Sequence, residues 1–335
     1  MELEVRAWGR ILAGYTPALS IEITRECPLR CPGCYAYGDE HLGGGVTLRE
    51  LRDFRGQELV DRVLALVENH RPVHVSIVGG EPLVRYRELN TILPQLSARG
   101  VHVQLVTSAV REIPVGWSRL SRLSIVVSVD GLPPEHDARR APATYERILK
   151  NISGHQITVH CTITRQQATR PDYIEEFVTF WSKQQETKRV WISLYTPQTG
   201  EISGERLTRD DRRRIIADLL ALRIRYPKLQ MTKGTIDAYA DPPTSPEECV
   251  FARMTATISA DLKTTITPCQ FGGVPDCANC GCLASAGLNA LVRHRFFGVI
   301  PLAPLYTGSV RVGDYVRRWR AADSRARAIL KRSEG

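Results

Sequence analysis

The segment ECPLRCPGCYAYG, residues 26–38, places three cysteines within eight positions, at Cys27, Cys31 and Cys34. It follows the strand-like run ALSIEIT, residues 18–24, so the thiols lie on a loop at the carboxyl end of a predicted strand. A structural zinc site normally takes four protein ligands. Three thiolates on a flexible loop also suit one face of an iron–sulfur cube. The segment therefore predicts either a zinc knuckle completed by a distant ligand or a cluster whose fourth iron takes a non-protein ligand.

The composition and the cysteine count restrict the kind of protein. The chain has 335 residues, of which 43% are hydrophobic and 24% charged, as in soluble globular proteins. No apolar run reaches the ~18 residues of a membrane-spanning helix, and the N-terminus lacks the apolar stretch of a secretory signal. We therefore expect a cytoplasmic protein, in which nine cysteines indicate metal binding or catalysis rather than disulfides. Cys161, inside an apolar strand-like run, is expected in the core.

The chain is basic, with a net charge of +9 from 45 Lys and Arg against 36 Asp and Glu. Arginines concentrate in two late helical stretches, residues 212–225 and 317–332. Such stretches form either solvated helix faces or a surface for nucleic acid, anionic lipid or an acidic peptide. Because no nucleic-acid-binding motif accompanies the charge, we favour solvated faces and expect no nucleic-acid partner.

Strand-like runs alternate with helical stretches over the first two thirds of the chain. This order predicts β–α–β units and a parallel sheet. We predict an α/β fold: a partial (β/α)6 TIM-type barrel over residues 15–228, followed by a small α+β domain over residues 229–335. The expected strands are 18–24, 73–78, 101–107, 124–129, 157–164 and 190–195. The expected helices are one opened by a capping box at Thr47 and ending before Pro72, then 87–99, 144–151, 173–184, one capped by Thr208 and ending at Arg225, and 314–331.

Chemically distinctive segments fall at the carboxyl ends of these strands. After the cysteine segment come GGEP (79–82), Thr107-Ser108, SVDG (128–131) and Tyr195. Barrels of parallel strands carry their active sites at this edge, so we predict that these segments surround one site. Ser193, Tyr195 and either His160 or Cys161 are expected to face the same cavity, although packing alone would also account for them.

A second group of cysteines lies in the last third of the chain. DPPTSPEEC (241–249) indicates a linker, and ATISADLKTTITPC (256–269) predicts a hairpin. Four thiolates complete a closed iron–sulfur cluster, and a zinc knuckle is the alternative. The cluster is the preferred alternative if the first group also holds one. The candidate ligands are Cys249, Cys269, Cys277, Cys280 and Cys282.

Taken in order, these motifs resemble the radical S-adenosylmethionine (SAM) enzymes, over roughly Ala18 to Tyr195. The defining C-x3-C-x2-C motif of that family follows the first strand of a partial (β/α)6 barrel, as Cys27, Cys31 and Cys34 do here. The resemblance implies a [4Fe–4S] cluster whose fourth iron is chelated by the amino and carboxylate groups of SAM. It also implies that the reduced cluster donates an electron, that SAM is cleaved, and that a 5′-deoxyadenosyl radical abstracts hydrogen from a substrate.

The same resemblance assigns further SAM contacts. Residues 79–81 are similar to the GGE motif, which accepts a hydrogen bond from the SAM amino group, and glycines there permit close backbone approach. Ser128 and Asp130 occupy positions that often contact the ribose or carboxylate of SAM. Arg140 ends a segment similar to HDxxR, and a guanidinium suits a carboxylate. With Tyr35, discussed next, the implied SAM contacts are Tyr35, Gly79, Gly80, Glu81, Ser128, Asp130 and Arg140.

One position departs from the family pattern. The residue before the last cysteine is usually aromatic and lies near the adenine of SAM, but here it is Gly33. The resemblance therefore implies that the adenine contacts either Tyr35, just after the last cysteine, or another group.

The second group resembles the SPASM and twitch extensions of radical SAM enzymes, which hold auxiliary [4Fe–4S] clusters and place one cysteine before a hairpin and one after it. Five cysteines support one auxiliary cluster. We choose Cys249, Cys269 and Cys277 with either Cys280 or Cys282 as its ligands. Its expected role is to relay an electron to or from a substrate radical, or to fix this domain.

The resemblance leaves the substrate to be chosen between a peptide and a smaller molecule. Relatives with such extensions often modify ribosomally made peptides, so we favour peptide maturation, with an electron donor such as flavodoxin or ferredoxin. Because only 17 residues precede the first strand, leader recognition would need a separate partner. The alternatives are a lipid, isoprenoid or other small molecule, which the apolar run Phe296–Leu305 and the basic helices would suit, and a non-catalytic zinc or iron–sulfur binding protein. No catalytic side chain is assigned.

Overall fold

The computed structural model describes residues 2–296 and 299–333. Its main sheet has seven strands: β1 (Ala18–Glu22), β2 (His74–Val78), β3 (His102–Thr107), β4 (Leu123–Ser128), β5 (Ile157–Ile163), β6 (Thr187–Leu194) and β7 (Thr255–Ile258). They are all parallel and lie in the order β6-β5-β4-β3-β2-β1-β7. The predicted α/β fold with its six parallel strands is confirmed, and the sheet gains a seventh strand from the last third of the chain.

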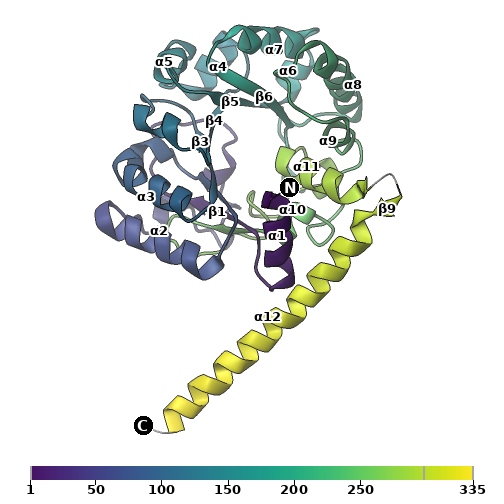
Figure 1. Ribbon diagram of the computed structural model, residues 1–335. Helices are drawn as coiled ribbons and strands as arrows, with labels where there is room; N and C mark the ends of the chain where they lie inside the picture. The colour runs from purple at the N-terminus through teal and green to yellow at the C-terminus, as the bar shows by residue number, and fades with distance from the viewer. Residues whose placement is uncertain (1, 297–298, 334–335) are drawn as a thin grey trace.

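Helices cover the outer face of the curved sheet, which stays open as a partial barrel (Figure 1). The helices are α1 (Glu2–Leu12), α2 (Gly56–His70), α3 (Tyr86–Ala98), α4 (Pro133–Arg140), α5 (Tyr145–Asn151), α6 (Arg165–Ala168), α7 (Tyr173–Lys183), α8 (Arg209–Arg225), α9 (Lys233–Asp237), α10 (Val250–Met254), α11 (Leu283–Arg293) and α12 (Leu302–Ser333). The strand pair β8 (Arg295–Phe296) and β9 (Ile300–Pro301) joins α11 to α12.

The gap between the two edge strands is spanned by helices from the last third of the chain. α10 packs against β7, α11 packs against β6, and α10 and α11 pack against each other. The segment that carries the second cysteine group therefore lies across the open side of the barrel. In Figure 1 this segment, in light green, faces the inner side of the strands.

β7 differs from the hairpin that its sequence predicts. It pairs in parallel with β1, with Ala18 opposite Thr255 and Ile21 opposite Ile258. The chain then turns back, and Ile258 forms a single antiparallel bridge with Thr265. The turn of the hairpin is present, but its first arm extends the main sheet because that arm can bury its apolar side chains beside β1.

Most helix ends agree with their sequence signals. Thr208 caps α8 through its hydroxyl, as predicted, and the hydroxyl of Thr144 caps α5 in the same way. The prediction that a helix starts at Thr47 is wrong. The capping box there closes one short 3₁₀ turn, Leu48–Glu50, and α2 begins only at Gly56. The intervening segment leaves the helical path because Phe54 is buried and Asp53 binds Arg85.

The C-terminal helix is longer than predicted, because α12 already begins at Leu302 rather than near residue 314. It packs on α1, where the Trp8 indole donates to Ser309 (2.9 Å), and then extends away from the barrel (Figure 1). Residues 297 and 298 of the apolar run 296–305 lie outside the described residues. Among the described helices, none combines the length and the apolar character needed to cross a membrane.

Two glycines after β2 allow its end to cross the end of β1 at close range. Gly79 has φ of +77°, and a Cβ there would lie 2.2 Å from the Cβ of Glu22. Gly80 has φ of +55°, and its Cβ would lie 2.3 Å from the carbonyl oxygen of Glu26. The sequence suggested that the backbone at these glycines approaches another group closely. In the structure that group is Glu22 of β1 for Gly79 and the carbonyl of Glu26, in the following loop, for Gly80.

Replacing Gly79 by alanine tests this crossing, with Gly154 as the matched control. Gly154 has nearly the same φ, +78°, but open space around it. Gly154→Ala should lower the free energy of unfolding by about 1 kcal/mol, from backbone strain alone. Gly79→Ala should lower it by about 3 kcal/mol or more, because overlap with Glu22 adds to the strain. Urea unfolding followed by circular dichroism measures both, and equal losses would contradict the crossing.

Candidate active site

The first cysteine group lies on the loop after β1, at the carboxyl edge of the sheet, and all three thiols are partly buried. The backbone N–H of Cys34 donates to the Cys31 carbonyl (3.3 Å), which folds the loop into a turn. At its base, the N–H of Glu81 donates to the Glu26 carbonyl (2.8 Å) and ties the loop to the end of β2. The three thiols are therefore presented together on a loop anchored to the sheet.

These thiols resist ionisation on their own. Burial raises the pKa of Cys27 to about 11, and the nearby charges of Glu81, Cys31 and Cys34 raise it further. Burial also raises the pKa of Cys31 and of Cys34. Such thiols keep their protons at neutral pH unless a bound cation replaces them. This donor set fits a metal centre.

The Glu81 carboxylate is buried and fully engaged within the protein. One oxygen accepts hydrogen bonds from the Leu83 N–H (2.8 Å) and the Thr107 hydroxyl. The other accepts the N–H (2.8 Å) and the hydroxyl of Ser108. An ionised carboxylate offers about four acceptor positions, and all four are taken here. Glu81 therefore orients the edge of the site, and the acceptors left for a ligand at this motif are backbone carbonyls.

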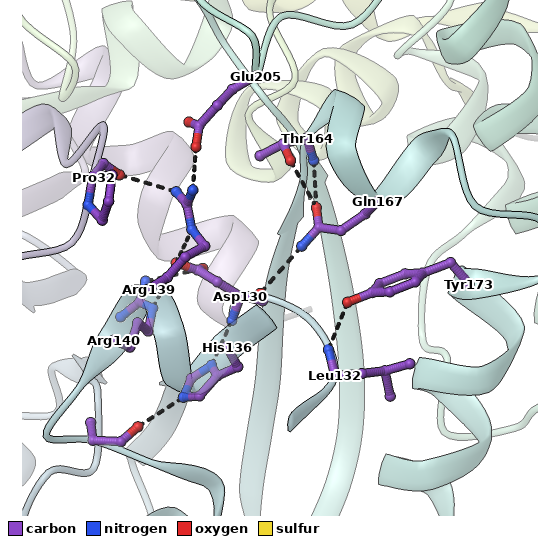
Figure 2. Close-up of polar contacts among 11 residues, drawn as sticks. Pro32, Asp130, Leu132, His136, Arg139, Arg140, Thr164, Gln167, Tyr173 and Glu205 are labelled. Atoms are coloured by element: carbon purple, nitrogen blue, oxygen red, sulfur yellow. Dashed lines mark hydrogen bonds and ion pairs between the residues drawn. The ribbon is translucent and has the colours of Figure 1, made fainter. Parts of the chain in front are cut away.

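Asp130, after β4, forms the charged side of the site with two arginines of α4 (Figure 2). Its carboxylate lies 2.8 Å from Nε of Arg140 and 3.5 Å from Nε of Arg139. Burial alone would raise the pKa of Asp130, but the guanidinium groups outweigh it and hold the pKa below its usual value. The carboxylate of Asp130 in turn raises the pKa of Arg140, against the effect of burial. The predicted SAM contacts Asp130 and Arg140 are thus brought together as a partly buried ion pair.

Neighbouring side chains hold this loop in place (Figure 2). The N–H of Asp130 donates to Nδ1 of His136 (3.0 Å), whose other ring nitrogen donates to the Ala143 carbonyl (2.8 Å). The Gln167 amide donates to the Asp130 carbonyl (3.2 Å), and the Leu132 N–H donates to the Tyr173 hydroxyl (2.7 Å). Ser128 ends β4 just before this loop.

The second cysteine group surrounds one cavity, which all five of its cysteines line. Burial raises the pKa of Cys269 to about 12 and that of Cys277 to about 11. The buried guanidinium of Arg212, on α8, donates to the carbonyls of Asn279 (3.0 Å) and Cys280 (2.9 Å). A rigid, desolvated set of thiols around one cavity fits a metal centre as well.

Among the described residues, no group of three or more His, Cys, Asp and Glu side chains is arranged to hold one metal ion.

Tyr35 and His41 lie between the two groups. The Tyr35 ring packs edge-on against His41 (5.5 Å) and Phe271 (5.4 Å), and Phe271 follows Cys269 by two residues. His41 places Nδ1 3.0 Å from the Phe271 carbonyl and Nε2 2.8 Å from the Glu22 carboxylate. Both partners are acceptors, so the ring donates from both nitrogens and carries a positive charge.

β5 and β6 contribute uncharged groups to the inside of the barrel. Nε2 of His160 lies 2.7 Å from the Ser193 hydroxyl, which also accepts the Leu283 N–H (3.3 Å). Burial lowers the pKa of His160 to about 4, so its imidazole is neutral. The Tyr195 hydroxyl donates to Glu201 (2.6 Å). Cys161 is fully buried in the hydrophobic core, as predicted.

Several residues that organise the site had not been singled out from the sequence: Glu22, His41, Arg139, Glu205 and Arg212. Glu22 gave one signal, since it is a charged residue inside an apolar strand. The others act through partners far along the chain, and their local sequence gives no sign of those contacts.

Comparison with known proteins identifies the barrel segment. Residues 21–164 match the family model of the radical SAM superfamily. The chain is similar to 7-carboxy-7-deazaguanine synthase of Hyperthermus butylicus, with 33% identity over 107 residues, or 32% of this chain and 41% of that protein. It is also similar to PqqA peptide cyclase of Rhizobium meliloti, with 27% identity over 121 residues, or 35% of this chain and 30% of that protein. The matches span less than half of either relative.

Among solved structures, the chain is similar to anSMEcpe, determined with bound AdoMet and the Cp18Cys peptide. The TM-score is 0.56 at 12% identity, and the likeness covers 82% of this chain and 81% of that chain. At this identity the likeness establishes the shared fold, a partial barrel, and nothing further.

The charged state of His41 predicts how stability changes with pH. Burial opposes the charge, but the Glu22 carboxylate and the Phe271 carbonyl outweigh it and raise the pKa of His41. The stabilisation is fully present below the unfolded value near 6.5 and is lost as pH rises through the folded pKa. His41→Gln should therefore lower the free energy of unfolding by about 3 kcal/mol at pH 6, and by less at pH 9.

Urea unfolding of wild type and variant at pH 6, 7.5 and 9 measures this difference. His70→Gln on α2 is the control, because burial lowers the pKa of His70 and gives its contribution the opposite slope. A His41→Gln difference that stays constant with pH would contradict the ion pair.

Proposed function

Because residues 21–164 place this chain in the radical SAM superfamily, we propose that it is an enzyme that reductively cleaves SAM and abstracts hydrogen from a substrate, with a peptide as that substrate. The observation that carries the proposal is the first cysteine loop. Three desolvated thiols stand together at the carboxyl end of β1, beside the partly buried pair of Asp130 and Arg140. This arrangement supplies ligands for three irons and charged groups around the fourth.

In this proposal Cys27, Cys31 and Cys34 hold a [4Fe–4S] cluster. When bound and reduced, that cluster supplies the electron that cleaves SAM into methionine and a 5′-deoxyadenosyl radical. The chain's own residues bind SAM and orient it. The Gly79 and Gly80 carbonyls offer acceptors to the amino group of SAM, while Glu81 keeps that edge rigid.

Three further residues surround the remaining parts of SAM in this proposal. The Arg140 guanidinium attracts a carboxylate, and its ion pair with Asp130 fixes its direction. The hydroxyl of Ser128, at the end of β4, can bond to the ribose. Tyr35 supplies an aromatic surface beside the cysteine loop, and 37% of its side chain is exposed. That exposure supports Tyr35 as the contact to the adenine or to the substrate.

We further propose that residues 229–335 form an auxiliary unit holding a second [4Fe–4S] cluster. Support comes from the cavity that Cys249, Cys269, Cys277, Cys280 and Cys282 line. Its position across the open side of the barrel suits an electron relay to or from the substrate, and it also shields the inside of the barrel from water. The first electron would come from a donor such as flavodoxin or ferredoxin, in the cytosol.

The choice of substrate rests on the similar proteins. PqqA peptide cyclase is named for a peptide, and anSMEcpe was solved with one. 7-Carboxy-7-deazaguanine synthase is named for a small molecule and supports the alternative, radical modification of a lipid, isoprenoid or other small molecule. The auxiliary unit favours the peptide. The further alternative, a non-catalytic zinc or iron–sulfur binding protein, predicts that the chain does not cleave SAM.

Iron content tests the cluster assignment. Anaerobically reconstituted wild type should hold about eight iron atoms per chain, and Cys27→Ser/Cys31→Ser/Cys34→Ser about four, because each [4Fe–4S] cluster needs its thiolates. After reduction with dithionite, wild type should form 5′-deoxyadenosine from SAM and the triple variant should not. Cys161→Ser, in the core, is the matched control and should keep its iron. Wild type with almost no iron, or with no SAM cleavage, would overturn the proposed function.

Hydrogen abstraction leaves a mark that identifies the substrate class. Cells that carry the gene are grown in deuterium oxide, and their peptide, lipid and small-molecule fractions are each given to the reconstituted enzyme. Mass spectrometry of the 5′-deoxyadenosine should find deuterium only with the peptide fraction, since the radical takes its hydrogen from the substrate. Deuterium from the lipid or small-molecule fraction alone would replace the peptide by that alternative.

A further inference from the structure

The loop between β6 and α8, residues 195–208, contacts both cysteine groups. Two neighbouring residues at its end point to different partners. Glu205 pairs with Arg139, beside the first group, and Arg206 pairs with Asp276, directly before Cys277 of the second group. One short segment is therefore joined to both groups through adjacent side chains.

The contact to the first group runs through one guanidinium. Arg139 donates one Nη to the Glu205 carboxylate and the other to the Pro32 carbonyl (3.0 Å), inside the cysteine loop (Figure 2). The backbone of Glu205 is anchored in turn, since its carbonyl accepts the N–H of Arg165, the first residue of α6 (3.0 Å). Glu205 and Arg139 are both largely buried. The cysteine loop is thus held from the opposite side of the barrel.

This contact also explains the glycine at position 33. Gly33 has φ of +66°, and a Cβ there would lie 2.9 Å from Oε2 of Glu205. The carboxylate of Glu205 therefore occupies the place that a side chain at position 33 would take. The absence of an aromatic residue before Cys34 and the presence of this carboxylate are two parts of one arrangement.

The contact to the second group is broader. The Arg206 guanidinium lies 2.6 Å from Asp276, and the Asp276 N–H donates to the Pro197 carbonyl (2.9 Å). The Thr199 N–H donates to the Val274 carbonyl (2.8 Å). The loop thus runs antiparallel to residues 274–276, immediately before Cys277.

We propose that Glu205 and Arg206 are positioning residues, which fix the first and the second cysteine group respectively and so set the separation of the two metal centres. This rests on the proposed function for the identity of those centres. The physical basis is two charged hydrogen bonds: the one between Glu205 and Arg139 is largely buried, where such a bond is stronger and more costly to lose than at the surface, and the one between Arg206 and Asp276 is more exposed.

The experiment compares Glu205→Gln with Arg206→Gln in the full chain. Hydrogen–deuterium exchange should become about five- to tenfold faster within residues 28–37 in Glu205→Gln, and about threefold faster within residues 274–282 in Arg206→Gln, which loses a more exposed pair. Each variant should leave the other segment unchanged. In the reconstituted, reduced chain, Glu205→Gln should alter the electron paramagnetic resonance signal of the first cluster only, and Arg206→Gln that of the second only.

Two charge-matched control variants test whether loss of a charge alone changes the exchange rates or the resonance signals. Asp210→Asn and Arg213→Gln remove the same charges from an exposed pair on α8 and should change neither readout. Glu205→Asp keeps the charge and should restore part of the protection of residues 28–37.

The proposal is supported if Glu205→Gln loses exchange protection only within residues 28–37 and Arg206→Gln only within residues 274–282. Equal acceleration of both segments by either variant, or no change in its own segment, would overturn it. The exchange measurement does not depend on bound iron, so it separates this inference from the proposed function, which fails instead if wild type binds no iron or does not cleave SAM.

Discussion

The buried carboxylate of Glu22 is the contact on which the arrangement of the two cysteine groups depends. It ends β1 and binds His41, from the segment after the first group, and Ser259, from the segment after β7. Gly79 passes so close that a side chain there would overlap it. A buried charge without such partners costs several kcal/mol. Three segments distant in sequence therefore have to meet where β1 ends, and both cysteine groups are anchored beside that point.

The parts that could be predicted from the sequence are those with a local cause. Parallel strands bring their carboxyl ends to one edge, so the cysteine loop, residues 79–81 and Asp130 could be assigned to one site from their places after apolar runs. The helix caps at Thr144 and Thr208 act on backbone groups three residues away and were equally accessible. The pairing of Asp130 with Arg140 spans ten residues and follows from the turn into α4.

The parts that could not be predicted depend on partners far along the chain. Alternation in residues 256–269 predicts a hairpin, but the choice of β1 as the partner of β7 depends on an edge strand formed more than 230 residues earlier. The capping box at Thr47 is present, yet burial of Phe54 delays the helix. Gly33 could be recognised as unusual, but its cause is a carboxylate 172 residues later, at Glu205.

The charges around the thiols help to distinguish a metal-binding site from a site with a nucleophilic cysteine. A reactive cysteine needs a nearby cation to stabilise its thiolate. At the first group, Arg139 and Arg140 carry two positive charges, but Asp130 and Glu205 carry two negative charges and hold them in ion pairs. At the second group, Arg206 is paired with Asp276, and Arg212 binds backbone carbonyls. These arginines hold the loops in shape. Burial raises the pKa of Cys31, Cys34 and Cys280, and it outweighs the attraction of Arg140 for the first two thiolates and of Arg212 for the third. In the proposed function a bound cluster would supply the positive charge that these thiols lack, which favours their interpretation as cluster ligands over one as nucleophiles.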